Sequence, residues 1–372
     1  MPCTPLLLIV EAPSLITVLG LDIGGANTKA ALLTTEKTKI TTFKTASAYF
    51  PVWKNPQALP EVLINLKKQL GANQIDALGL TLTAELSDVY QTKREGVHHI
   101  LSCVKAAFSD VPIFVLTTNV ELLPIETAEK NPLCVAAANW AATGWLMTQY
   151  LKDSLIVDVG STSTSIIPII NRQVAARGKT DLDKLIYGEL VYTGSLRTNI
   201  ATIVRSIPTK NGVASVSSEL FALSGDVHLV LKNISTNDYT SETADGRGKT
   251  LTEAYTRLAR VICADTDMLT TQEITDMAKY IHEQQINQIA EGIAKTYTYL
   301  KTHTTDRVPV VVTGLGKNFL ANKAAEKIGI DTIVDLDTLL PKGVALATPA
   351  TGVAWMTTAK LTGKTSFKLI TP

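Results

Sequence analysis

The chain has 372 residues, of which 45% are hydrophobic and 19% charged, and its formal net charge is +1. This length accommodates two domains with substantial cores, and the balance of 35 basic and 34 acidic residues excludes the basic surface of a nucleic-acid-binding protein. The four cysteines are scattered without a CxxC pair, which argues against a structural zinc site.

Residues 1–17 precede the first expected strand and are predicted to be a leader. The apolar run 6–10 within it is too short to span a bilayer and has no basic flank, since Glu11 and Pro13 follow directly. We therefore expect a cytoplasmic protein with no membrane partner.

The segment 18–33 consists of an apolar strand, an acid, two glycines, small polar residues and a second apolar strand. Gly24 and Gly25 permit a tight turn whose backbone N–H groups can contact an anion. Asp22, at the end of the strand, is placed to hold a hydrated Mg²⁺ beside that anion. Three further side chains can donate hydrogen bonds to the same anion: Asn27, Thr28 and Lys29.

The pattern of the next 120 or so residues is that of an α/β lobe. A hairpin is expected through 34–45, and helices over 60–70 and 94–108 alternate with strands over 75–83 and 112–116. An alanine-rich helix is expected over 132–151, and its small side chains predict close packing against another element.

Two carboxylates follow the strand at 75–83. Glu85 and Asp88 are three residues apart, which places two side chains on one face of a helix. Carboxylates just past a strand end in an α/β lobe lie near bound ligands. The alternative is a helix N-terminus at which acids complement the dipole, and the residues alone favour that interpretation.

The acid–glycine pattern recurs 136 positions after Asp22. Asp158 ends an apolar strand, and it is followed by four residues that can bind a phosphate: Gly160, Ser161, Thr162 and Thr164. Two such turns predict two related lobes that face one phosphate-bearing ligand.

The remainder of the chain contains a third glycine turn and two polar segments. Arg197 lies in a cluster of glycines and hydroxyls, and Asp245 lies in a polar stretch over 232–250 that is predicted to be a surface loop over a site. Helices are expected over 250–264 and 270–301. A strand over 308–312 then leads to Gly314 and Gly316. A helix over 321–327, a strand over 332–335 and a closing helix within 349–359 complete the pattern.

These motifs together resemble the actin-like ATPase superfamily, and within it the hydantoinase/oxoprolinase branch. More narrowly, the segments 83–90, 188–194, 196–198, 243–247 and 258–265 resemble proteins of the tetrahydromethanopterin- and methanofuran-linked C1 pathway. The resemblance implies an α/β, two-lobed, ribonuclease H-like fold with a ligand cleft between the lobes. We expect the first lobe at 18–150 and the second at 151–372, with an inserted segment at about 171–305.

The archaeal members of this group include the methanofuran-biosynthesis synthases, and the resemblance implies their reaction. An aminomethylfuran-methyl diphosphate would be coupled to the phenol oxygen of γ-glutamyltyramine or a related tyramine, with release of diphosphate. The two turns would then hold the diphosphate, with Mg²⁺ held by Asp22 and Asp158, and Glu85, or else Asp88, would accept the phenol proton. Four further residues are assigned to substrate binding: Arg197, Asp245, Gly314 and Gly316.

Two departures from the relatives bear on this interpretation. The relatives usually carry an acid where this chain has Ser165, and the turn at 314–316 lacks the fuller glycine run of adenosine-binding proteins, which disfavours ATP. The motifs equally permit an ATP-dependent small-molecule kinase or an oxoprolinase-like amidase. A repressor related to sugar kinases is disfavoured, because about 17 residues before the first strand do not provide a helix-turn-helix.

Overall fold

The computed structural model describes residues 15–37, 39–304, 306–340, 343–365 and 368–369. Most of the expected leader lies outside the described residues. Its last three positions belong to the first strand, β1 (Leu15–Ile23), which therefore begins earlier than expected.

The first sheet is built around β1. Its strands lie in the order β15 (Lys368–Leu369), β3 (Lys39–Tyr49), β2 (Asn27–Glu36), β1, β4 (Ala77–Leu82), β5 (Ile113–Leu116) and β6 (Leu122–Pro124). β1 pairs antiparallel with β2 and parallel with β4. The expected hairpin between β2 and β3 is confirmed.

The second sheet repeats this central pattern. Its strands lie in the order β10 (Leu190–Val191), β8 (Thr164–Ile170), β7 (Ser154–Val159), β13 (Val310–Thr313) and β14 (Ile333–Asp335), and β9 (Gln173–Val174) pairs with β8. β7 pairs antiparallel with β8 and parallel with β13, as β1 does with β2 and β4. The repetition confirms two related lobes, as expected from the two acid–glycine motifs.

Helices separate and cover the two sheets. One face of the first sheet packs on α1 (Leu59–Gln69) and α2 (Lys93–Ala107), through alternate residues of β1 such as Leu19 and Leu21. Its other face and the facing side of the second sheet share one apolar layer, which contains α4 (Asn139–Thr148) and α11 (Thr348–Thr362). The far side of the second sheet packs on α9 (Thr271–Lys301) and α10 (Asn322–Lys327). Strands β1 and β7 are thus buried on both faces, which explains their continuous apolar sequences.

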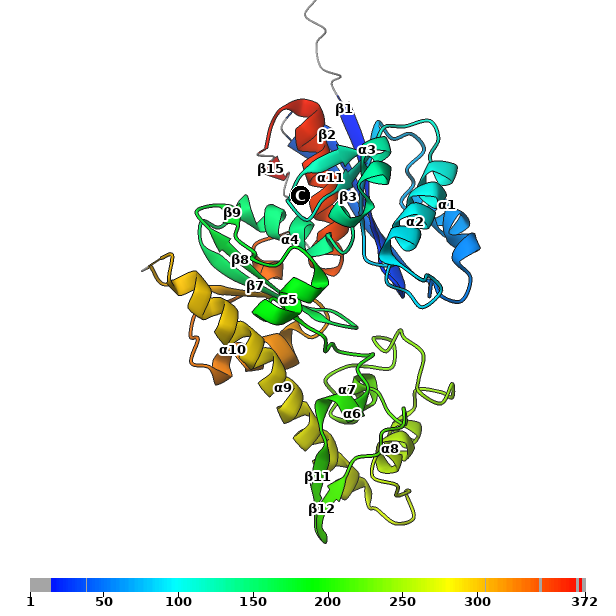
Figure 1. Ribbon diagram of the computed structural model, residues 1–372, viewed down its shortest axis with the longest axis vertical. Helices are drawn as coiled ribbons and strands as arrows, with labels where there is room; N and C mark the ends of the chain where they lie inside the picture. Colours follow the sequence, from blue (N-terminus) through cyan, green and yellow to red (C-terminus); the bar gives the residue numbers. More distant parts are fainter. Residues whose placement is uncertain (1–14, 38, 305, 341–342, 366–367, 370–372) are drawn as a thin grey trace, which may run out of the picture.

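Helix α11 was expected in the second lobe, but it packs on the first sheet (Figure 1). The contact is close, because a Cβ on Gly20 of β1 would lie 2.1 Å from the carbonyl oxygen of Ala350. Likewise, a Cβ on Gly352 would lie 2.4 Å from the carbonyl oxygen of Ala142 in α4. Glycine at these positions allows the helix to lie between the strand and α4, which corrects the expected boundary of the second lobe.

The inserted segment has a core of its own at the lower end of Figure 1. It contains α6 (Ile200–Ile203), β11 (Ser206–Thr209), β12 (Gly212–Ser215), α7 (Ser224–Val230), α8 (Leu251–Arg260) and the first half of α9. The expected span of 171–305 is too wide, because β9, β10 and the second half of α9 belong to the second sheet and its cover. The helix α5 (Asp181–Tyr187) lies beside β10.

Capping explains where the long helices begin. Thr250 and Thr270 each form a capping box with the glutamate three residues later, as the sequence predicted.

The alanine-rich helix is shorter than expected, because Ala137 has a φ of 53° and α4 begins only at Asn139. The remaining helical elements are α3 (Ile125–Lys130), η1 (Pro56–Ala58), η2 (Pro132–Cys134), the π-turn η3 (Lys317–Ala321), η4 (Leu336–Thr338) and η5 (Ala345–Ala347). Within the described ranges, no helix is both long and apolar enough to cross a bilayer.

Candidate functional site

The turns that follow β1 and β7 contain the same backbone hydrogen bond. The Gly24 N–H donates to the Asn27 carbonyl, and the Gly160 N–H donates to the Ser163 carbonyl, each over 3.0 Å. The next N–H groups, those of Gly25 and Ser161, have no hydrogen-bond partner in the described part of the chain. Free N–H groups at such turns are suited to bind an anion.

Each turn is braced by a second segment. Phe50 and Val52 donate backbone hydrogen bonds to the first turn over 2.9 Å, and Ser195 and Leu196 do the same for the second turn.

The two braces contact each other through Trp53 and Arg197. The guanidinium of Arg197 lies 4.9 Å from the ring centroid of Trp53 and donates a 3.2 Å hydrogen bond to Thr162 of the second turn. Arg197 therefore stands at the phosphate-type turns and links the two turns together, whereas its predicted role in substrate binding stays a prediction.

The register of the strands places the two acids in equivalent positions. Asp22 lies opposite Lys29 on β2 and beside Thr81 on β4. Asp158 lies opposite Ser165 on β8 and beside Thr313 on β13. Since side chains alternate along a strand, Asp22 faces the same side as Gly20, and Asp158 the same side as Ile156, which are the sides toward the shared helical layer. Both acids therefore point into the space between the sheets.

The electrostatics of the two acids agree with this placement. Burial raises the pKa of Asp22 to about 6, with a further increase from Asp158 and an opposing effect of Lys29. Burial also raises the pKa of Asp158, again opposed by Lys29. One lysine thus acts on both carboxylates. The Oδ1 atom of Asp22 is buried without a hydrogen-bond partner among the described residues, as are the hydroxyls of Thr81 and Thr313.

Two threonines that were expected to bind phosphate lie on the opposite faces of the sheets. Thr28 pairs with Ile23, and Thr164 pairs with Val159, so each faces the outer helices. The hydroxyl of Thr164 donates to the Thr193 carbonyl over 2.8 Å. The two-residue period of a strand thus turns both side chains away from the acids, so phosphate binding by Thr28 and Thr164 stays a prediction that the geometry does not favour.

The third glycine turn lies directly beside the second acid. Gly314 has a φ of +85°, and a Cβ there would lie 2.5 Å from the Oδ1 atom of Asp158. The Gly316 N–H donates to the Val159 carbonyl over 3.0 Å. The structure therefore brings Gly314 and Gly316 together with the second phosphate-type turn.

Glu85 and Asp88 lie in a turn and not on a helix, because α2 begins only at Lys93. Their expected common face is absent: Glu85 is 1% exposed, whereas Asp88 is exposed. A Cβ on Gly25 would lie 3.3 Å from the hydroxyl of Ser87, so the turn containing Glu85 packs against the first glycine turn. Of the two acids, Glu85 has the environment of a base.

Glu85 has an unusual environment for a carboxylate. Neither of its oxygens has a hydrogen-bond partner within the described residues, and the nearest cation, Lys93, is 3.7 Å away. Burial raises the pKa of Glu85 to about 7, although Lys93 opposes the increase. A carboxyl group that titrates near neutral pH is suited to accept a proton.

Asp245 lies apart from the turns, in the inserted segment. Its carboxylate accepts hydrogen bonds from Arg257 over 3.1 Å and from Arg260 over 3.3 Å, and Arg257 also pairs with the buried Asp226. This network holds the inserted segment together. Substrate binding by Asp245 stays a prediction, and the geometry does not favour it.

Sequence reasoning missed a set of buried or bridging side chains near Glu85. Lys93 pairs with Asp181 of α5 over 2.6 Å. One turn further along α5, the ammonium of Lys184 lies 3.9 Å from the ring centroid of Trp140, and its burial lowers its pKa to about 8. The sequence carried no signal for this arrangement, because α5 exposes its apolar residues Leu182, Leu185 and Ile186 and buries its lysine, the reverse of what the residue types indicate.

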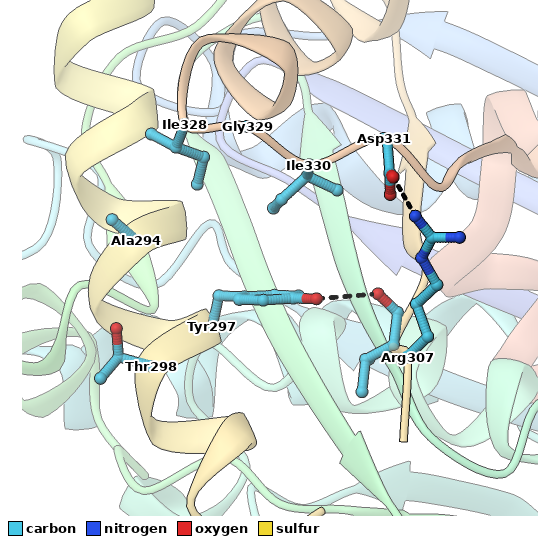
Figure 2. Close-up of a pocket in the computed structure, with 9 residues that line it drawn as sticks. Ala294, Tyr297, Thr298, Arg307, Ile328, Gly329, Ile330 and Asp331 are labelled. Atoms are coloured by element: carbon cyan, nitrogen blue, oxygen red, sulfur yellow. Dashed lines mark hydrogen bonds and ion pairs between the residues drawn. The ribbon is translucent and has the colours of Figure 1, made fainter. Parts of the chain in front are cut away.

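A pocket of about 260 Å³ lies elsewhere (Figure 2). It is lined by Tyr297 and its neighbours on α9, by Arg307 and Val308, and by residues 328–331. Arg307 and Val308 precede β13, and residues 328–331 precede β14, so the pocket lies at the opposite end of the strands from Gly314. It is therefore separate from the glycine turns.

The hydantoinase/oxoprolinase family model matches residues 76–359. The chain belongs to the hydantoinase/oxoprolinase family. It also resembles the (4-{4-[2-(γ-L-glutamylamino)ethyl]phenoxymethyl}furan-2-yl)methanamine synthase of Methanocaldococcus jannaschii, with 39% identity over 91% of this chain and 97% of the relative. A synthase of the same name from Methanococcus vannielii is 34% identical over 57% of this chain and 94% of the relative.

A similar fold is found in one solved structure with low sequence identity. A nucleotide-free structure of acetone carboxylase superposes with a TM-score of 0.54 at 11% identity, over 91% of this chain and 70% of that one. The expected two-lobed, actin-like α/β fold is confirmed.

Proposed function

We propose that this protein is an ether-forming synthase of methanofuran biosynthesis. It couples an aminomethylfuran-methyl diphosphate to the phenol oxygen of γ-glutamyltyramine or a related tyramine, and diphosphate is released. The name of the relative from Methanocaldococcus jannaschii describes such a phenoxymethylfuran product, and this chain covers 97% of that relative. The observation that carries the proposal is the convergence of Asp22, Lys29 and Asp158 beside two turns with free N–H groups.

The reaction requires stabilisation of a leaving group more than a strong nucleophile. The bond between the furan-methyl carbon and the diphosphate oxygen breaks, and the electron pair leaves with the diphosphate. The ring oxygen of the furan stabilises the remaining positive charge. Lys29 and the N–H groups of Gly25 and Ser161 are placed to stabilise the negative charge that develops on the diphosphate.

The second half of the reaction forms the ether. The phenol oxygen bonds to the furan-methyl carbon and loses its proton. Glu85 is the proposed acceptor of that proton, because its buried carboxylate has no hydrogen-bond partner among the described residues and its turn packs against the first glycine turn through Ser87.

Asp22 and Asp158 are suited to hold Mg²⁺. Mg²⁺ is commonly bound by one or two carboxylates together with substrate phosphates and water. Asp22 has a buried oxygen with no partner among the described residues, and no third His, Cys, Asp or Glu joins these acids there. When bound, the ion would neutralise charge on the diphosphate. Such chemistry on small metabolites fits an enzyme that works in the cytoplasm.

The proposal is tested with purified protein, Mg²⁺, the furan-methyl diphosphate and γ-glutamyltyramine or tyramine, by measuring diphosphate release and the mass of the ether. We expect release only when both substrates are present. The variant Asp22→Asn should lose activity by about 10²–10³-fold, as expected for a group that stabilises the transition state. The matched control is Asp276→Asn, which alters an exposed carboxylate on α9.

A parallel reaction offers ATP and the phenolic substrate without the furan-methyl diphosphate. Consumption of ATP with no coupling in either reaction would overturn the synthase and would support the kinase or amidase instead.

A further inference from the structure

Lys93 lies between two carboxylates that come from different lobes. Its ammonium is 2.6 Å from the Oδ2 atom of Asp181 and 3.7 Å from the Oε1 atom of Glu85. Lys93 is the first residue of α2, which covers the first sheet, and Asp181 is the first residue of α5, which lies beside β10 of the second sheet. The shorter ion pair is therefore a bridge between the lobes.

The position of this one ammonium decides the environment of Glu85. The carboxylate of Glu85 is 1% exposed, and its two oxygens have no hydrogen-bond partner among the described residues. The charged groups that act on it are Lys93 of α2, which favours its ionised form, and Asp181 of α5, which favours its protonated form. A buried carboxylate depends on a nearby cation, and here the cation forms its closer contact with Asp181.

The inference rests on the proposed function, in which Glu85 accepts the phenol proton. We propose that Asp181 is a positioning residue: it holds Lys93 away from Glu85 across the two lobes and thereby keeps the Glu85 carboxylate basic enough to take that proton. If the lobes separate, the bridge between Lys93 and Asp181 breaks, and the ammonium is free to pair with Glu85. Glu85 is therefore basic enough to take the proton only while the two lobes lie together.

A second ion pair between the first lobe and the inserted segment provides a matched comparison. Lys54 pairs with Glu242 over 2.5 Å, and both side chains are about half exposed, at 52% and 54%. Neither is among the groups that act on Glu85. Its loss removes a link of the same kind without changing the environment of the proposed base.

The test is the pH dependence of kcat/KM, whose acid limb reports the ionisation of the base in the free enzyme. Asp181→Asn removes a negative charge and releases Lys93 toward Glu85, so the pKa of Glu85 falls and the limb moves to lower pH. Lys93→Gln removes the cation, so the pKa rises and the limb moves to higher pH. Each shift should be about one pH unit, the lower end of the effect of a charge within 4–6 Å.

Two further variants complete the design. Asp181→Glu keeps the charge and should return the limb close to the wild-type position, and Lys54→Gln should leave it unchanged. A purely structural bridge predicts lower activity in both Asp181→Asn and Lys93→Gln with an unmoved limb, and that result would overturn the proposal.

A second readout does not depend on turnover. The carboxyl band of Glu85 can be assigned in infrared difference spectra as the band lost in Glu85→Gln, and its titration followed in each variant. Opposite shifts in Asp181→Asn and Lys93→Gln would support the positioning role even if no ether formed, in which case only the synthase proposal would fail. Equal or absent shifts of this band would overturn the positioning role, whatever the enzyme makes.

Discussion

The two glycine turns contain the same backbone hydrogen bond, but the charged residues beside them differ. In the first turn Asp22 lies opposite Lys29, and in the second Asp158 lies opposite Ser165. The neighbouring strand contributes a buried threonine in both lobes. The lobes therefore keep the acid and the threonine and differ in the cation.

This difference shows how two related lobes can form a site in which only one lobe supplies the positive charge. Lys29 acts on both carboxylates, so a single positive charge faces two carboxyl groups. A second lysine at position 165 would neutralise the pair and remove the reason to bind a cation. With a serine there, the two carboxylates and the single lysine leave the site with a net negative charge.

Exchange of Lys29 and Ser165 between the two turns should have the largest effect on activity. Lys29→Ser should lower kcat/KM for diphosphate release by about 10²-fold, since one donor to the developing charge is lost. The double variant Lys29→Ser/Ser165→Lys returns the charge to the same space from the other lobe and should recover about tenfold of the loss. A double variant no better than the single one would show that the lysine must come from the first turn.

The second comparison concerns the third glycine turn. Gly314→Ala should lower the free energy of unfolding by more than the about 1–2 kcal/mol of the left-handed backbone, because the new Cβ would lie 2.4 Å from the Val159 carbonyl oxygen. It should also reduce activity about tenfold, because the Cβ displaces Asp158. Gly329→Ala is the control: its φ is +79°, but no atom lies within 4 Å of the added Cβ. Urea unfolding and diphosphate release measured on both variants should separate backbone strain, common to both, from loss of activity, confined to Gly314.

The smallest expected effect concerns the contact between the braces of the two turns. Trp53→Leu removes the ring above Arg197, a contact of about 0.5–1 kcal/mol, and should raise KM for the diphosphate substrate about threefold. Phe114→Leu removes a similar contact with Lys360, remote from the turns, and should leave KM unchanged. An unaltered KM in Trp53→Leu would show that the turns keep their positions without this link.

The fold could be predicted from the sequence because the patterns that indicate it lie within short segments of the chain. Each apolar strand that ends in an acid and a glycine carries its own evidence, as do the capping boxes at Thr250 and Thr270. Periodicity correctly placed most helices to within a few residues.

The parts that escaped prediction depend on contacts between distant segments. Lys93 and Asp181 are 88 residues apart, and neither has a local pattern that indicates its partner. Glu85 was assigned to a helical face because spacing alone does not reveal that a turn precedes α2. Thr28 and Thr164 were assigned by composition, whereas the strand register decides which way they face.

Helix α11 gives the first lobe an unusual dependence on the order of synthesis. The strands β1, β2 and β4 are made within the first 82 residues, but the helix that covers one face of them spans Thr348–Thr362. While the chain is being translated, that apolar face stays without its native cover until residues 348–362 leave the ribosome. The first lobe is therefore completed only after the strands of the second sheet have been made, and a premature stop before α11 should leave a chain that chaperones and proteases recognise.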